Sequence, residues 1–207
     1  MALPLFLLTL SLGWVSSSLP LYLWSQGRHG VPVSLGVEPQ ELRAIDRALI
    51  GYFRSDQEPL RIELRDQDLF NAREVVHLRD VKGLLRLNSL LRGLSLAYLL
   101  AFTLGGLGLR RRAFWGPFRG LLRLGAAITL GLILALGLGI ALGFDRLFLA
   151  FHLLSFSNPF WQLDPRQDRL IVLFPQGFFY NMSLLVATAT ASQALVLGAL
   201  AHWWRKT

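Results

Sequence analysis

The chain has 207 residues, of which 53% are apolar, and it carries a formal net charge of +8 without a single cysteine. Long apolar runs in so short a chain are typical of an integral membrane protein with one compact membrane domain. The absence of cysteine excludes disulfides, thiolate catalysis and zinc–thiolate sites. The positive charge does not indicate nucleic acid binding, because membrane topology accounts for it, as shown below.

Four long, sparsely charged apolar stretches predict four membrane spans. They cover approximately residues 2–24, 87–109, 121–144 and 179–202. The first stretch lacks the basic start of a signal peptide and ends in aromatic residues suited to a headgroup boundary, so we interpret it as a retained span. The predicted fold class is an all-α transmembrane bundle of four helices with a small extracytoplasmic cap containing short β-strands.

The loop after the first span, residues 25–86, is too long to lack structure of its own. Its segment Glu38–Phe53 has apolar residues at helical spacing and predicts an amphipathic helix. The residues that define its apolar face are Leu42, Ile45, Leu49 and Ile50. This helix would give the cap a buried face of its own.

Two further segments of this loop alternate between apolar and other residues. Residues 60–64 place Leu and Ile between charged side chains, and residues 31–37 alternate in a similar way. Both patterns predict strands, so we expect a small cap that contains β-structure. Asn71 followed by Glu74 resembles a helix capping box and predicts a helix that begins near Ala72.

The second half of the chain contains one short basic connection and one longer polar loop. Residues 110–120 join the second and third spans, and residues 145–178 join the third and fourth. Phe144–Phe156 is a strongly apolar helical stretch that we interpret as lying at the membrane interface. The loop beyond it contains proline, asparagine, aspartate and aromatic residues and a short strand-like run, and loops of this kind often carry function.

Charge distribution predicts the orientation in the membrane. All thirteen acidic residues lie in the loops 25–86 and 145–178, whereas the connection 110–120, Arg123 and the C-terminal tail contain only basic charges. By the positive-inside rule the basic connection and the C-terminus are cytoplasmic. With four spans the N-terminus is cytoplasmic as well, and both acidic loops face outward.

Two histidines on the outward side are the leading candidates for chemistry, His77 and His152. On a helix, Glu74 and Asp80 lie at i−3 and i+3 from His77, where a carboxylate can fix the ring tautomer and raise the basicity of the other nitrogen. That arrangement suits a general base, although a surface ion pair has the same spacing. The candidate acids for the same role at His152 are Asp145, Asp164 and Asp168.

Other reaction classes fit the sequence less well. Two histidines and several carboxylates on one side are possible zinc ligands, but His77 is not part of a His-Glu-x-x-His motif. His152 has no second ligand within a helical turn. Serine-based acyl chemistry lacks the Gly-x-Ser-x-Gly elbow. We therefore expect neither a metal nor a cofactor.

Two runs of residues resemble hallmarks of a family of small four-span bacterial membrane proteins that includes the lipoprotein intramolecular transacylases. The first run is Asp68–Lys82, which contains Glu74, His77 and Asp80, and Leu78 replaces an expected methionine conservatively. The second run extends from Phe151 to Phe179. Its matching residues include His152, Asn158, Trp161, Asp164, Pro165, Asp168 and Pro175.

The resemblance implies an acyltransferase of the bacterial inner membrane whose active site faces outward. Its substrate is a diacylated lipoprotein, and it moves the sn-2 acyl chain of the S-diacylglyceryl cysteine to the α-amino group of the same cysteine, without a cofactor. The resemblance further implies that His77 and His152 converge as a general acid and base, in contact with membrane lipid. Supporting roles, including orientation of His77 and stabilisation of an oxyanion, are expected from Glu74, Asp80, Lys82, Asn158, Trp161 and Asp164.

Two alternatives remain open from the sequence. The first is a non-enzymatic accessory protein that binds a lipoprotein or a secreted partner, and it should tolerate substitution of either histidine. The second is an outward-facing metallopeptidase, which chelators should inhibit. A transacylase needs both histidines and is indifferent to chelators.

Overall fold

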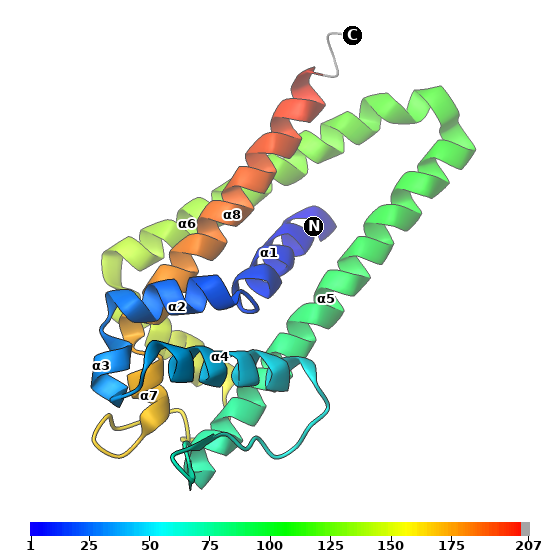
Figure 1. Ribbon diagram of the computed structural model, residues 1–207. Helices are drawn as coiled ribbons and strands as arrows, with labels where there is room; N and C mark the ends of the chain where they lie inside the picture. Colours follow the sequence, from blue (N-terminus) through cyan, green and yellow to red (C-terminus); the bar gives the residue numbers. More distant parts are fainter. Residues whose placement is uncertain (204–207) are drawn as a thin grey trace. The chain divides into compact units, whose positions relative to one another are not determined.

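The computed structural model describes residues 1–203, apart from the side chains of Arg111 and Arg112. The basic tail residues Arg205 and Lys206, which support the predicted orientation, lie outside the described residues. The elements are α1 (Ala2–Val15), α2 (Leu19–Arg28), α3 (Val31–Leu35), α4 (Pro39–Arg54), β1 (Glu63–Leu64), β2 (Gln67–Asp68), α5 (Ala72–Arg110), η1 (Arg111–Phe114), α6 (Trp115–Ser155), α7 (Arg169–Leu173) and α8 (Gln176–Trp203) (Figure 1). The chain is therefore mostly helical, as predicted.

The chain divides into two compact units, and each is described by itself. The span unit comprises Met1–Trp14, Leu87–Leu142 and the chain from Leu184 on, and the loop unit comprises Val15–Arg86 and Gly143–Ser183. Helices α5, α6 and α8 are long and apolar enough to cross a membrane, and α1 with α2 would make a fourth span as a broken pair. The coarse prediction of a bundle of apolar helices is thus confirmed.

The first predicted span is not one continuous helix. α1 ends at Val15 and α2 begins at Leu19, with Pro20 in its first turn. Proline lacks the N–H that a continuous helix would need there, and its fixed φ favours a new helix start. The Tyr22 hydroxyl donates to the carbonyl of Ser16 over 2.9 Å, so one carbonyl freed by the break keeps a partner.

The alternation at residues 31–37 gives a short helix, α3, so the strand prediction there is wrong. Val31 and Leu35 are buried, whereas Val33 is 87% exposed, which is the i, i+4 pattern of one helical turn. Gly30 and Gly36 flank the turn with φ of 65° and 64°, a left-handed conformation that glycine adopts without a steric penalty. α3 packs against α2 and α7 (Figure 1).

The predicted amphipathic helix is confirmed as α4, and its four apolar-face residues are buried. It packs against α2 within the loop unit (Figure 1). Leu60 and Ile62 are buried as the alternation predicted, but the only paired strand residues in the described chain are those of the antiparallel hairpin β1–β2. Arg65 and Asp66 form its turn with positive φ, as two-residue hairpins require. The β-structure of the described chain is therefore one two-stranded antiparallel sheet of four residues.

α5 begins at Ala72, as the capping box predicted, and continues without interruption to Arg110. The backbone N–H of Asn71 donates to the Glu74 carboxylate over 2.7 Å, and the N–H of Glu74 donates to the Asn71 side-chain oxygen over 3.1 Å. These reciprocal bonds satisfy two donors that a helix start leaves unpaired. His77 is thereby fixed in the second turn of a well-defined helix.

The second polar loop also differs in detail from the prediction. α6 continues to Ser155 but has non-helical backbone angles at Gly143, so the segment that begins at Phe144 is a separate helical stretch, as its sequence indicated. The strand-like run after Asp168 is instead the short helix α7, with Leu170 and Leu173 buried three residues apart. Neither segment requires a sheet partner, because each satisfies its backbone bonds locally.

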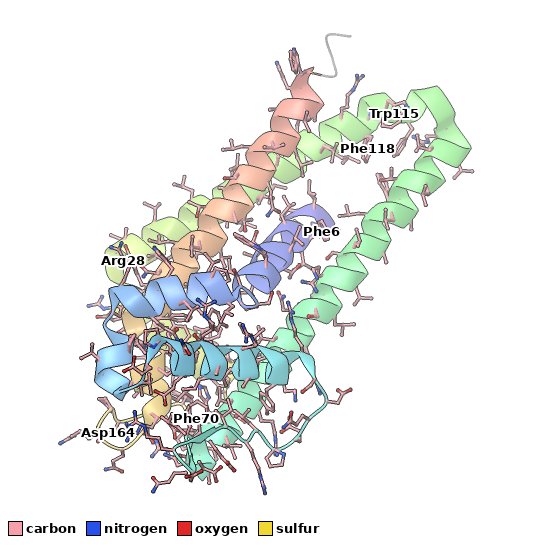
Figure 2. The ribbon with its side chains drawn as sticks, in the orientation of Figure 1. Phe6, Arg28, Phe70, Trp115, Phe118 and Asp164 are labelled. Carbon is pink, nitrogen blue, oxygen red and sulfur yellow. The ribbon has the colours of Figure 1, made fainter. Side chains whose placement is uncertain are left out.

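The span unit has a small apolar core and a broad apolar surface. Leu7, Ala126 and Ala194 form its buried cluster, and many leucines elsewhere on its helices are exposed, as expected for lipid-facing surfaces. Trp115 and Phe118 lie beside the connection from α5 to α6 (Figure 2). Their ring centroids are 5.9 Å apart, with the rings edge to face.

Candidate active site

The structure brings together His77 and His152, which are 75 positions apart in the sequence. His77 lies on α5 and His152 lies in the last turn of α6, both within the loop unit. Their ring centroids are 6.2 Å apart and both residues are buried. The two polar loops therefore contribute one imidazole each to a common site.

The neighbours of His152 fix its tautomer. Its Nδ1 lies 2.8 Å from the carbonyl oxygen of Phe148, which only accepts, so Nδ1 carries the proton. In the neutral ring, Nε2 then has a free lone pair and can take a proton. Aromatic rings surround this imidazole, with centroids at 4.3 Å (Phe148), 5.0 Å (Trp161), 5.3 Å (Phe151) and 5.5 Å (Phe156). Burial among them lowers the pKa of His152, against the effect of the Phe148 bond.

His77 is a second neutral imidazole. Burial lowers its pKa to about 4, with a further contribution from nearby His152, whereas the charge of Asp80 acts in the opposite direction. Its ring meets Phe156 edge to face, with the centroids 4.8 Å apart. Its Nδ1 is buried and has no hydrogen-bond partner among the described side chains and backbone. No hydrogen bond within the described protein therefore occupies Nδ1 of His77.

Glu74 does not orient His77, contrary to one role considered for it. Its carboxylate is almost wholly buried and accepts the backbone N–H of Leu170 over 2.7 Å with one oxygen and that of Asn71 with the other. Burial raises the pKa of Glu74, although these backbone donors oppose the shift. The carboxylate thus ties the start of α5 to the start of α7, which holds the second polar loop beside His77.

A second connection lies at Asp80, six residues further along α5. The Asn158 side-chain amide donates to the Asp80 carboxylate over 2.8 Å, and the Asn158 oxygen accepts the N–H of Phe160 over 3.1 Å. This pair fixes the loop that carries Trp161. Of the predicted supporting residues, Asp80 and Asn158 thus bond to each other, and Trp161 contacts His152.

Comparison with known proteins identifies the family. A family model described as lipoprotein intramolecular transacylase Lit matches residues 1–179. The chain belongs to the Lit family. A solved structure of the membrane-integral lipoprotein intramolecular transacylase Lit from Bacillus cereus is similar over 99% of this chain and 91% of that chain, with a TM-score of 0.84 and 22% identity.

Two further structures of Bacillus cereus Lit, in which one histidine is replaced by arginine or by alanine, give TM-scores of 0.78 and 0.79 at 21% identity. They cover 99% of this chain and 88% and 89% of theirs. No curated protein matches the sequence. This Lit-family chain is accordingly a multi-pass membrane protein and an acyltransferase of lipoprotein maturation, with a lipoprotein as substrate.

Two of the supporting residues predicted for this Lit-family site lie elsewhere. The Lys82 ammonium is buried, donates to the carbonyl of Gln57 over 2.7 Å and to Glu58 over 3.1 Å, and lies 3.9 Å from the centre of the Tyr52 ring. Asp164 lies in the loop before α7 and binds the exposed Arg166 (Figure 2). Lys82 therefore anchors the loop after α4, and Asp164 shapes its own loop.

The carboxylates considered as partners of His152 bind other groups. Asp145 accepts from Gln176 over 2.8 Å, and buried Asp168 accepts from Asn71 over 2.8 Å. The carbonyl of Phe148 takes the orienting role instead. The i−4 spacing of Phe148 from His152 was the available signal, because a helical side chain can bond back to that carbonyl.

The aromatic enclosure of the Lit-family histidines was missed as well. Phe156 contacts both imidazoles, and Phe148 contacts one, yet single phenylalanines in an apolar run do not indicate which ring faces a polar group. Over residues 1–203, no group of three or more His, Asp or Glu side chains converges in a way that could hold a metal ion. The two imidazoles therefore lie together in an aromatic, largely apolar setting.

Proposed function

We propose that this Lit-family chain transfers the sn-2 acyl chain of an S-diacylglyceryl cysteine to the α-amino group of the same cysteine, with His77 and His152 as the proton-transfer pair. The observation that carries the proposal is the pair itself: two buried imidazoles 6.2 Å apart, one of them with its Nε2 free to accept. Nucleophile and ester belong to one molecule, so positioning supplies much of the rate.

The reaction needs three proton movements. The α-ammonium loses one proton before its nitrogen attacks the ester carbonyl, the nitrogen loses a second as the amide forms, and the glycerol oxygen gains one as the carbon–oxygen bond breaks. The products are an amide and an alcohol, so one proton is released overall when the substrate starts as the ammonium. His152 takes the first proton at Nε2, because its Nδ1 proton is held by the Phe148 carbonyl. His77 lies near enough to relay a proton to the leaving oxygen.

The low pKa of both imidazoles supports this proposal. Burial keeps the imidazoles unprotonated at neutral pH, so Nε2 of His152 is available as a base without prior deprotonation. Surrounding aromatic rings exclude water, which would otherwise hydrolyse the ester. Phe151 and Phe156 also offer apolar surface to the acyl chain.

The proposal includes the membrane topology. The four spans are the broken pair α1–α2 and helices α5, α6 and α8, with both termini and the basic connection around Arg110 in the cytoplasm. The histidine site then faces outward in the bacterial inner membrane. There it meets the acyl chains and the cysteine of a membrane-anchored lipoprotein.

The test is mass spectrometry of a lipoprotein N-terminal peptide from a bacterium that lacks its own lipoprotein N-acylation and expresses this chain. We expect an N-acyl, S-monoacylglyceryl cysteine with unchanged total acyl mass. An untouched diacylglyceryl cysteine, from cells in which the protein is well expressed and membrane-inserted, would contradict the proposal. Loss of acyl mass would indicate hydrolysis instead.

A further inference from the structure

Asp80 lies one helical turn beyond His77 on α5, at the same sequence distance as Glu74 on the other side. It is half-buried, and its charge acts on the imidazole of His77. The other charged groups of this part of α5 are engaged elsewhere. Arg73 bonds to the carbonyl of Gln162, Arg79 and Lys82 bind Glu58, and Arg86 binds Asp56. None of these cations neutralises Asp80.

The partner that Asp80 does have is a neutral amide. Asn158 binds its Oδ2, and across the described part of the chain no donor is recorded for its Oδ1. Asp168, the other acid that links α5 to the second loop, differs because Arg73 lies 4.0 Å from it. Among the described residues, Asp80 therefore has no cationic partner and one oxygen without a donor, whereas both oxygens of Glu74 accept backbone N–H groups.

A partly buried carboxylate without a cationic partner is costly, and a cationic ligand that donates hydrogen bonds would offset that cost. The substrate of the proposed function has one such group, the α-ammonium of its N-terminal cysteine. We infer that Asp80 binds this ammonium through Oδ1 and places the amine beside the two histidines. The inference rests on the proposed function and adds a recognition group to it.

Binding at Asp80 also fits the proton transfer. When the ammonium gives one proton to His152, the positive charge moves from the amine to an imidazolium without leaving the neighbourhood of the carboxylate. The carboxylate therefore stabilises the charge before and after the step. The freed nitrogen forms the new bond to the acyl carbon and loses its second proton, the glycerol oxygen leaves with one proton, and the other is released to solvent. Asp80 itself exchanges no proton.

The sequence offers a variant that removes the charge and keeps the loop in place. In Asp80→Asn the amide oxygen can still accept from Asn158, so the connection between α5 and the second loop persists. A matched control is Asp145→Asn, which removes the charge from another acid that pairs with a neutral amide, Gln176, and that is exposed. Thermal unfolding of all three proteins checks that the variants are folded.

The probes are two lipopeptides in detergent micelles that cannot react, because ether linkages replace both esters of the diacylglyceryl cysteine. One has the α-amino group and the other has hydrogen in its place. We expect the wild type and Asp145→Asn to bind the amine form roughly 10- to 100-fold more tightly, as for one charge-assisted hydrogen bond. Asp80→Asn should bind the two forms equally, with an unchanged Kd for the form without the amine.

Equal binding of both probes by the wild type would overturn the inference, and so would a preference for the amine that survives in Asp80→Asn. Acyl transfer by the wild type on the corresponding ester lipopeptide is measured separately. Transfer without an amine preference would refute the role of Asp80 alone. An amine preference without transfer would refute the proposed function and leave Asp80 as the group that binds the ammonium.

Discussion

The buried hydroxyls of the span unit and the buried carboxylates of the loop unit are satisfied in different ways. In the span unit, buried hydroxyls bond back to their own helix: Thr190 donates to the carbonyl of Val186 and Thr129 to that of Gly125, both over 2.7 Å. In the loop unit, buried polar side chains bond to other elements, as Glu74 does with the N–H of Leu170, 96 positions away. A hydroxyl that bonds to its own helix requires no partner on a neighbouring element, whereas a bond such as that of Glu74 to Leu170 holds two segments together.

The difference shows where this protein needs precision. Lipid-facing helices pack through shape, and membrane hydrogen bonds contribute little to their association. An acyl transfer site needs its groups held in a defined geometry, which requires specific partners on rigid elements. We therefore expect substitutions of polar residues to be costly in the loop unit and mild in the span unit.

The largest difference between the two units should be in the effect of histidine substitutions on acyl transfer. His77→Ala or His152→Ala should lower acyl transfer by roughly 10²- to 10⁴-fold, the usual contribution of a general acid or base. His202→Ala, at an exposed position in the span unit, should leave the rate unchanged. The assay follows the mass shift of a lipopeptide in detergent. Full activity of either site variant would refute the pair.

The next largest effect concerns Asp46, which is fully buried beside Gln26. Gln26 donates to Asp46 Oδ1 over 3.0 Å, and the remaining side-chain oxygens of both residues are buried without a recorded partner in the described chain. One proton on Oδ2 of Asp46 would satisfy both atoms, by donation to Gln26. Burial raises the pKa of Asp46 to about 7, against the effect of the Gln26 bond.

The raised pKa of Asp46 predicts how the stability of the folded protein changes with pH. The folded protein holds a proton that the unfolded chain releases near pH 4, so the free energy of unfolding falls between about pH 4 and 7, by at most about 1.4 kcal/mol per pH unit. In Asp46→Asn the amide replaces the protonated acid, and this contribution should disappear. Thermal unfolding in detergent at several pH values measures both slopes, and identical slopes would contradict the neutral pair.

A smaller loss of stability is expected at Glu74. In Glu74→Gln only one of the two backbone N–H groups keeps an acceptor, and a buried donor without a partner costs about 1–3 kcal/mol. Glu63→Gln is the control, because its side chain is exposed on the hairpin. The midpoint of thermal unfolding compares the two. Equal midpoints would mean that the link between α5 and α7 contributes little.

The smallest effect should be that of Thr190→Val in the span unit. The substitution keeps the volume and removes a hydroxyl that bonds only to its own helix, whose carbonyl at Val186 retains its backbone partner. We expect a change in stability below about 1 kcal/mol, in keeping with hydrogen bonds inside membranes. A loss as large as that of Glu74→Gln would remove the distinction between the units.

The elements that could be predicted from the sequence are those determined by residues close to one another along the chain. The capping box at Asn71, the amphipathic face of α4 and the long apolar helices depend on neighbouring residues along the chain. Short segments were harder, because five residues at 31–35 fit alternation and one helical turn equally well. The burial of Val31 and Leu35 together in the structure distinguishes the helical turn from the strand.

Within the site, the residue types were predicted better than their partners. His77, His152 and Trp161 were identified as candidates, and the structure places them together. The partner of Glu74 was not predictable, because Leu170 contributes its backbone N–H, a group that every residue type except proline has. The same holds for the carbonyl of Phe148.

The bond between Glu74 and Leu170 has a consequence for biogenesis. The ribosome adds Glu74 almost a hundred residues before Leu170, so the carboxylate lacks this partner while the residues between them are synthesised and inserted. His152 also emerges late, and the second loop is held in place only after that bond forms. In the proposed mechanism, a nascent chain therefore cannot transfer an acyl chain until both His152 and Leu170 have been synthesised.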